Sequence, residues 1–308
     1  MCQPWPVHEG SRKAVAAAFG ANVVIAAAKF VAFVFTGSAA LLAEAVHSVA
    51  DTGNQGLLFL GSRRASRDAT PEHPFGFGRE RYFWAFVVSV VLFTLGSAFA
   101  LFEGVDKLRH PHKPESLGWA IGVLAMAVVM ESLSFRTARH AAMTERAGNS
   151  WRQFIQVSKS PEIPVVLLED FGALVGLGFA LSGIICAKAT GNARFDAVGS
   201  LAIGLLLGAI ASLLAVEMKS LLIGEAADEQ TETALKEALV AHESVRRIIH
   251  VRTQHLGPDE LLVAAKLEFD PTLSFTLLSD AINSVERLVR DRVPSARLLF
   301  IEPDYFRR

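Results

Sequence analysis

Cysteine is scarce in this chain of 308 residues, and its two cysteines, Cys2 and Cys186, lie far apart and outside any CxxC motif. This spacing argues against a disulfide framework and against a zinc site built from cysteines. A charge excess of one sign is also lacking, because 30 lysines and arginines are balanced by 31 aspartates and glutamates. Without a large positive field, the chain is not expected to bind nucleic acid.

Common enzyme signatures are missing as well. The chain has no HExxH, no GxSxG and no GxxxxGK[ST] motif, which are the patterns used by zinc proteases, serine hydrolases and P-loop ATPases. We therefore predict that the protein is not an enzyme and holds no cofactor. The first residues, MCQPWPVHEGSRK, also lack the basic start and apolar core of a cleaved signal peptide.

Long apolar runs dominate what is present. Hydrophobic residues make up 51% of the chain and charged residues 20%, a balance that favours membrane spans over a soluble globular fold. Six segments reach the roughly 20 residues that a helix needs to cross a bilayer. They lie at about 13–36, 39–62, 82–106, 116–136, 163–187 and 195–219.

Basic residues are unevenly distributed among the connecting loops. Twelve lysines and arginines lie before the first segment, in the loops after the second and fourth segments, or at the adjoining segment ends Lys13 and Arg136, and the opposite side carries five. By the positive-inside rule, both termini are predicted to be cytoplasmic. The expected organisation is an N-terminal stretch at 1–12, a transmembrane domain at 13–224 and a cytoplasmic domain at 225–308.

From residue 225 the pattern becomes that of a small soluble α+β domain. A helical stripe over 231–242 precedes a strand at 245–255, and a second, alternating strand covers 262–269. An amphipathic helix then carries Leu278 to Val289, and a last strand covers 296–301. The predicted order is α-β-β-α-β, in a domain of about 80 residues, a size at which dimerisation often adds stability.

A line of polar side chains interrupts the second apolar segment. Spacings of three, four and three residues separate Glu44, His47, Asp51 and Asn54, so the four share one helix face. An ionisable side chain at the bilayer centre costs about 3 kcal/mol on insertion scales, so this face is expected to meet protein or water. For Glu44 or Gln55 taken singly, helix–helix hydrogen bonding and a functional role are equally good explanations. His47 and Asp51, one turn apart, offer instead a nitrogen and a carboxylate to a divalent transition metal.

The fifth segment supplies the matching charges, Glu169 and Asp170, side by side in an apolar run. Adjacent helical residues are about 100° apart, so the two cannot point equally well at one spot. We predict that Asp170 is a metal ligand. Glu169 is predicted to be a second ligand, a residue that contacts a ligand rather than the metal, or a proton carrier. Lys29 and Glu131 are further charges in apolar segments, and Lys29 is interpreted as snorkelling towards the interface.

Together these residues carry a resemblance that covers nearly the whole chain. The stretch TGSAALLAEAVHSVADTGNQ resembles the first loop and second helix of the cation diffusion facilitator (CDF) family of divalent-metal transporters. HPFGFGRERYFWA, FDAVGSLAIG and the α-β-β-α-β tail also match that family. The pieces HSVADTGNQGLL, HPFGFG and LLEDFGALVG are most similar to the zinc-transporter-nine-like branch.

This resemblance implies a fold, an activity and a set of ligands. The fold would be six membrane helices followed by a cytoplasmic ferredoxin-like domain, assembled as a homodimer through that domain. The activity would be export of zinc or a similar ion in exchange for protons. The family's two second-helix ligands correspond to His47 and Asp51, and its later fifth-helix ligand corresponds to Asp170.

The chain departs from the family pattern at two sites. The earlier fifth-helix ligand falls on Val166, which cannot bind metal, so Glu169 or water is expected to take its place. A site richer in oxygen should discriminate less sharply among zinc, cobalt, iron and manganese. In the loop before the third segment, His73 and Asp68 remain as accessory candidates, but Phe77 stands where a second histidine often occurs. His73 is therefore interpreted as structural.

The histidines of the tail do not match the family's metal positions. We interpret them, with two neighbouring carboxylates, as solvated surface. These residues are His242, His250, His255, Glu268 and Glu302.

The predicted mechanism is secondary transport by alternating access around a site near the bilayer midplane. Metal binding requires deprotonated ligands, so the ion displaces protons from His47 and the carboxylates. One alternative is a membrane-anchored metal sensor or regulator, and another is a transporter whose main substrate is manganese, iron or cobalt. The short N-terminal stretch favours a bacterial inner membrane.

Overall fold

The computed structural model describes residues 39–110, 117–146, 148 and 150–306, together with six scattered helical positions between Val23 and Val34. Within these ranges the side chains of 39–48, 117–121 and 123 are not described. The predicted first span, with Lys29, therefore lies largely outside the described residues, as does Cys2.

The chain forms two compact units. The helical unit comprises Met1–Arg63, Phe83–Ile155 and Pro161–Met218, and the C-terminal unit comprises Arg64–Tyr82, Gln156–Ser160 and Lys219–Arg308. Each unit therefore draws on separate stretches of sequence, and the loop at 64–82 belongs with the C-terminal residues.

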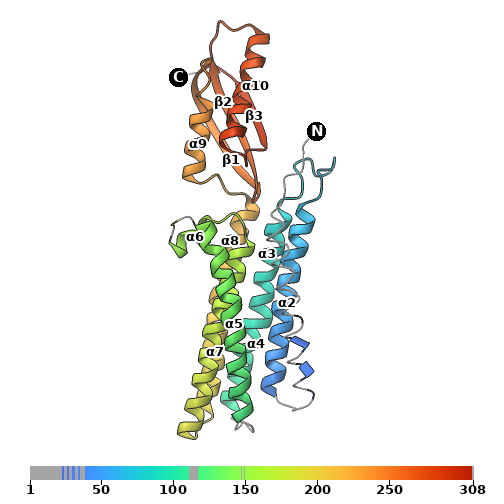
Figure 1. Ribbon diagram of the computed structural model, residues 1–308, viewed down its shortest axis with the longest axis vertical. Helices are drawn as coiled ribbons and strands as arrows, with labels where there is room; N and C mark the ends of the chain where they lie inside the picture. The colour runs from blue at the N-terminus through green and yellow to red at the C-terminus, as the bar shows by residue number, and fades with distance from the viewer. Residues whose placement is uncertain are drawn as a thin grey trace. The chain divides into compact units, whose positions relative to one another are not determined.

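The helical unit is built from long helices. In chain order these are α2 (Ala39–Ala65), α3 (Glu80–Val91), the π-helical η1 (Leu92–Ala98), α4 (Phe99–Arg109), α5 (Leu117–Arg146), the short α6 (Trp151–Val157), α7 (Glu162–Thr190) and α8 (Arg194–Ile223) (Figure 1). Among the described residues, three helical segments are long and apolar enough to cross a membrane: Glu80–Arg109, Glu162–Thr190 and Arg194–Ile223. They coincide with the predicted third, fifth and sixth spans. Helices α2 and α5 occupy the predicted second and fourth positions, and the count of six spans stays a prediction.

Small residues let the helices of this unit approach closely. A Cβ on Gly204 of α8 would lie 2.7 Å from a side-chain carbon of Leu101, and one on Gly183 of α7 would lie 3.0 Å from the carbonyl oxygen of Phe195. Ser97 in the π-helical turn donates a buried hydrogen bond of 2.8 Å to the carbonyl oxygen of Gly204. Close backbone approach and interhelical hydrogen bonds are the main attractions between helices in lipid, where no hydrophobic force drives association.

Helix α5 is longer than its apolar pattern predicts. It continues to Arg146, past the predicted end at 136, because Ala142 on this extension is buried against Phe154 of α6 and Leu167 of α7. The short helix α6 itself was not predicted. Seven residues leave too few turns for a helical period to stand out in the sequence.

The C-terminal unit contains the predicted α-β-β-α-β order. Its elements are α9 (Glu229–Leu239), β1 (Val245–Gly257), β2 (Glu260–Phe269), α10 (Phe275–Arg292) and β3 (Leu298–Pro303). Strand β2 is central, antiparallel to β1 and parallel to β3, and α10 makes the crossover between β2 and β3. Asp228 caps α9 by accepting a hydrogen bond of 3.0 Å from the amide of Thr231, and Ser274 accepts one from Leu277 at the start of α10.

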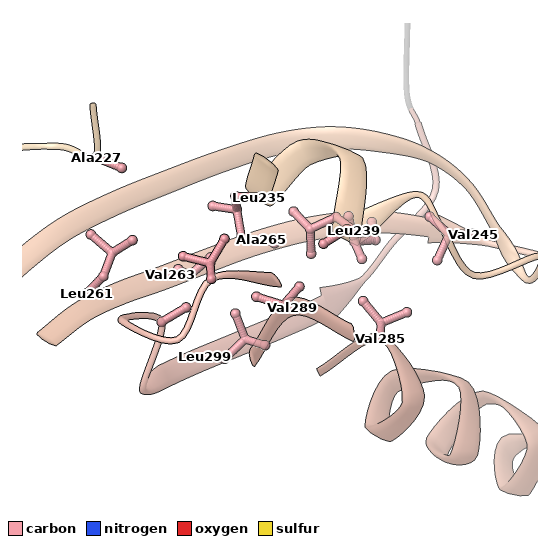
Figure 2. Close-up of a cluster of buried hydrophobic side chains, with 14 of the residues drawn as sticks. Ala227, Leu235, Leu239, Val245, Leu261, Val263, Ala265, Val285, Val289 and Leu299 are labelled. Carbon is pink, nitrogen blue, oxygen red and sulfur yellow. The ribbon is translucent and has the colours of Figure 1, made fainter. Parts of the chain in front are cut away.

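One apolar core holds this sheet and its two helices together. Alternate residues of β2, Leu261, Val263, Ala265, Leu267 and Phe269, are all buried on one face, as their alternation predicts. Figure 2 shows three of these packing with Leu235 and Leu239 of α9 and with Val285 and Val289 of α10. Full burial of each leucine or valine in this core contributes roughly 1.5–3 kcal/mol, so both helices are fixed on the same side of the sheet.

The loop between α2 and α3 packs against the β1–β2 hairpin. A Cβ on Gly78 would lie 2.7 Å from the carbonyl oxygen of Leu256 and 3.1 Å from the Cα of Gly257. Only glycine allows two backbones to approach this closely. Arg81 pairs with Asp259 at 3.5 Å beside the contact. The loop is therefore part of the C-terminal unit by direct packing.

Candidate functional site

The polar line predicted from the sequence lies on α2, in the helical unit. Asn54 is 1% exposed and Asp51 is half-buried, and their spacing of three residues places them on one helix face. Glu44 and His47 are earlier on the same helix, but their side chains are outside the described residues. The structure thus describes the second half of the predicted line.

Asn54 connects this line to α7. Its Nδ2 donates a hydrogen bond of 2.6 Å to Oε1 of Glu169, a carboxyl group that is 6% exposed. The amide oxygen of Asn54, Oδ1, is buried and has no hydrogen-bond partner among the described residues. An amide oxygen beside a carboxylate is a suitable pair of ligands for a divalent cation.

Asp170, the next residue of α7, is held by a different helix. Ser134 of α5 donates a hydrogen bond of 2.8 Å to its Oδ2, and the aspartate side chain is 6% exposed. The separation of about 100° between adjacent helical residues explains why Glu169 contacts α2 and Asp170 contacts α5. Nothing in the sequence around Ser134 indicates this contact, and we did not predict it.

Four carboxyl groups interact in this region. Asp51 interacts electrostatically with both Glu169 and Asp170, and Glu131 of α5 interacts with Asp170. Desolvating one carboxylate costs several kcal/mol even after relaxation, and like charges nearby add to that cost. Buried carboxyl groups beside one another favour either a bound proton or a nearby positive charge.

The described side chains do not form a complete ligand shell. Among them, no three His, Cys, Asp or Glu residues are arranged so that they could hold a metal ion. Val166, one turn before Asp170 on α7, is half-buried and offers no donor atom. His47 is not among the side chains described, so the predicted ligand set of His47, Asp51, Asp170 and Glu169 stays a prediction.

A comparison with protein families decides the class of the protein. The cation efflux transmembrane domain matches residues 15–223, which are most of the chain. The chain belongs to the cation diffusion facilitator family. As a CDF protein it is an integral membrane protein of a transporter family rather than an enzyme, and the family implies no cofactor.

Three relatives place the CDF protein within the family. "Proton-coupled zinc antiporter SLC30A9, mitochondrial" of Homo sapiens is 34% identical over 264 residues, 85% of this chain and 46% of that protein. "Metal tolerance protein C4" of Arabidopsis thaliana is 30% identical over 262 residues, 84% of this chain and 57% of that protein. "Magnetosome protein MamB" of Paramagnetospirillum magneticum is 25% identical and covers 93% of this chain and 92% of that protein. The chain therefore lies near the zinc-transporter-nine-like branch, as the sequence motifs predict.

The match covers only part of the SLC30A9 relatives. The chain spans about half the length of the SLC30A9 relatives it matches, 46% of the human protein and 47% of the mouse protein.

The accessory candidates of the CDF protein lie in the loop at 64–82. His73 is exposed, and its ring packs on that of Phe77 at 4.6 Å between centroids. Its backbone amide donates to the hydroxyl and to the carbonyl oxygen of Thr70. Asp68 is exposed as well. The roles of His73 and Asp68 stay predictions.

The tail histidines of the CDF protein differ from the prediction most at His255, and His242 is half-buried, its Nδ1 accepting a hydrogen bond from the amide of Ser244. His250 is exposed, as predicted, but His255 is 5% exposed, so its assignment to solvated surface is wrong. It lies where the register of β1 shifts before the hairpin turn, and the irregularity is not visible in the sequence. Its amide donates to the carbonyl oxygen of Glu225 at 2.8 Å, and its Nε2 has no hydrogen-bond partner among the described residues.

Burial of His255 makes the stability of the C-terminal unit depend on pH. Burial, and then the charge of Lys159, lower the pKa of His255 below its ordinary 6.5, against the opposing effects of Gly257, Asp228 and Glu225. The folded chain therefore favours the neutral ring, so the full stability is present above pH 6.5. Stability is lost as the pH falls from 6.5 through the lower folded pKa, by at most about 1.4 kcal/mol per pH unit for one proton.

We expect hydrogen exchange of β1 in the full chain to become faster between pH 7 and pH 5, after correction for the intrinsic exchange rate. The change should shrink in His255→Gln and persist in His250→Gln, an exposed control on the same strand. Equal pH dependence in both variants would contradict this assignment.

Proposed function

We propose that the CDF protein exports a divalent transition-metal cation, zinc in the first place, across a membrane in exchange for protons. The observation that carries this proposal is the electrostatic interaction of Asp51 on α2 with Glu169 and Asp170, two buried carboxyl groups of α7. The printed names of the SLC30A9 relatives, which specify a proton-coupled zinc antiporter, support the same cation and the same coupling.

The ligands proposed are His47 and Asp51 of α2 with Asp170 and Glu169 of α7. Asn54 supports the set because it holds one oxygen of Glu169 and keeps its own amide oxygen unpaired among the described residues. Oxygen thereby takes the place that Val166 leaves without a donor. Carboxylate and amide oxygens also suit manganese and iron, whereas His47 favours zinc and cobalt, so modest discrimination between these cations is part of the proposal.

The coupling follows from the charge of the site. With the site open to the cytoplasm, the cation displaces protons from His47 and the carboxyl groups, because metal binds their deprotonated forms. With the site open to the other side, protons return to the same groups and release the cation. Rocking of the helices between these two states is alternating access around a fixed site. The exchange needs no further chemistry from the chain.

The wider organisation follows the sequence predictions. We propose six membrane spans within 13–224, a cytoplasmic domain at 225–308, both termini in the cytoplasm and a homodimer formed through the C-terminal domain. The bilayer, the cation and protons are then the partners. The bacterial inner membrane predicted above and the mitochondrial location in the names of the SLC30A9 relatives have a proton gradient in common, which supplies the driving force.

The test is flux in proteoliposomes that contain the purified full chain and a trapped zinc indicator. We expect zinc entry to accelerate when the interior is acidic, and the interior pH to rise as zinc enters. The substrates are ranked by how strongly manganese, cobalt and iron, added as competitors, inhibit zinc uptake. Flux that ignores the pH gradient would indicate a channel, and zinc binding without flux would indicate the sensor alternative; either result would refute the exchange.

A further inference from the structure

Ser134 uses its hydroxyl differently from the threonines of its helix. On α5, Thr137 donates to the carbonyl oxygen of Leu133 at 3.0 Å and Thr144 donates to that of His140 at 3.3 Å. This bond to the preceding turn is the usual arrangement for serine and threonine within a helix. Ser134 instead donates to Oδ2 of Asp170 on α7, 36 residues away in the chain.

The packing around this hydrogen bond fixes its position. On one side, Leu124 and Ala127 of α5 pack with Leu177 and Ile184 of α7 in a buried cluster. On the other side, a second cluster joins the same two helices and contains Ala142, Phe154 and Leu167. With apolar contacts on both sides, α5 can neither rotate nor slide against α7 without disturbing a close-packed cluster. The donor is therefore held in place opposite the carboxylate.

We propose that Ser134 is a positioning residue of the transport site, which holds Oδ2 of Asp170 so that Oδ1 is presented to the cation. This inference rests on the proposed function and adds α5 as a third helix of the site. A carboxylate has two oxygens and can turn about its side-chain bonds. A hydroxyl bonded to one oxygen selects one orientation and favours a single metal–oxygen bond over a bidentate one. Groups that orient a ligand in this way typically change metal affinity by about 10–100-fold when removed.

The same arrangement recurs at the neighbouring carboxylate. Asn54 of α2 holds Oε1 of Glu169, as Ser134 of α5 holds Oδ2 of Asp170. Each acidic side chain of this pair on α7 thus has one oxygen fixed by a neutral donor from a different helix. Because neutral donors leave the charge of the carboxylates in place, the pair keeps its attraction for a cation.

The experiment compares four variants of the full chain in proteoliposomes. Ser134→Ala and Ser134→Val remove the hydroxyl, and Ser134→Thr retains it in nearly the same shape as valine. Ser132→Ala is the matched control, because Ser132 is exposed on the same helix two residues away. Initial rates of zinc uptake over a range of zinc concentrations separate KM from kcat, and the rise in Tm caused by zinc alone measures binding without transport.

We expect KM to increase by about 10–100-fold in Ser134→Ala and Ser134→Val with a smaller change in kcat, and both Ser134→Thr and Ser132→Ala to stay near the wild type. The zinc-induced rise in Tm should shrink in the same two variants. Wild-type values in Ser134→Ala and Ser134→Val would overturn the inference while leaving the proposed function intact.

Two other outcomes are decided by the same measurements. If the wild type carries no zinc flux, the proposed function fails, and the role of Ser134 is judged from the zinc-induced rise in Tm alone. The inference is overturned if this rise is the same in Ser134→Ala as in the wild type, or if neither protein shows a rise. If Ser134→Ala and Ser134→Val both fail to fold while Ser134→Thr folds, the hydroxyl has a role in folding, and the positioning role is refuted.

Discussion

Replacing Asp170 with alanine is expected to lower the rate of zinc uptake by at least about 100-fold. Removing a residue that only hydrogen-bonds to a metal ligand already lowers metal affinity or activity by about 10–100-fold, and loss of a ligand should cost more. We propose the carboxylate of Asp170 as a ligand because it is buried, accepts a hydrogen bond from Ser134 and interacts electrostatically with Asp51. The measurement is the initial rate of zinc uptake into proteoliposomes with an acidic interior.

Two further variants make this result specific. Asp170→Asn keeps an oxygen that Ser134 can bond but removes the charge, so it should transport almost as poorly as Asp170→Ala while its Tm stays closer to that of the wild type. Cys186→Ala changes an exposed residue near the end of the same helix and should transport normally. An uptake rate for Asp170→Ala within about 3-fold of the wild type, far less than a lost ligand costs, would show that Asp170 is not a ligand.

A histidine at position 166 is expected to sharpen the preference for zinc over manganese. Val166 lies four residues before Asp170 on α7 and is half-buried, so a side chain there lies on the same helix face as Asp170. Imidazole nitrogen suits zinc and cobalt, whereas manganese prefers oxygen. We expect Val166→His to raise the zinc-to-manganese ratio of uptake by about 10-fold or more, on the scale of a single added ligand group.

The matched control is Cys186→His, which adds the same side chain at an exposed position of α7. Its ratio of zinc to manganese uptake should equal that of the wild type. Val166→Asp provides the opposite test, because another carboxylate should favour manganese. If Val166→His and Val166→Asp both keep the wild-type ratio, position 166 does not face the cation, and the oxygen-rich character of the site has another origin.

Local periodicity was sufficient to predict much of the fold. The alternation of β2 and the helical spacing on α2 are each set by a repeat of two or of 3.6 residues, and burial follows the repeat directly. Once a strand is assumed for β2, its alternation assigns one face to the core, and Val263, Ala265 and Leu267 are buried as it requires. The end of α5 was less predictable, since its last turns are kept helical by Ala142 packing against α6 and α7.

Contacts between distant segments could not be predicted from the sequence. The bond of Asn54 to Glu169 spans 115 residues and that of Ser134 to Asp170 spans 36, and both depend on how each helix is rotated about its axis. That rotation is set by packing clusters which no periodic pattern encodes. His255 illustrates the same limit in a strand, because an irregular register moved it from the expected surface into the interior.

The packing of Gly78 against Gly257 has a consequence for how the chain can be divided. A chain cut after residue 224 would lack the β1–β2 hairpin but keep the loop at 64–82, which connects α2 to α3. The backbone around Gly78 would then lose its contact with the hairpin. A chain shortened in this way would therefore differ from the intact protein in the loop that follows the helix of the proposed ligands His47 and Asp51. Loss of transport on truncation would not by itself show that the C-terminal residues bind metal or regulate flux.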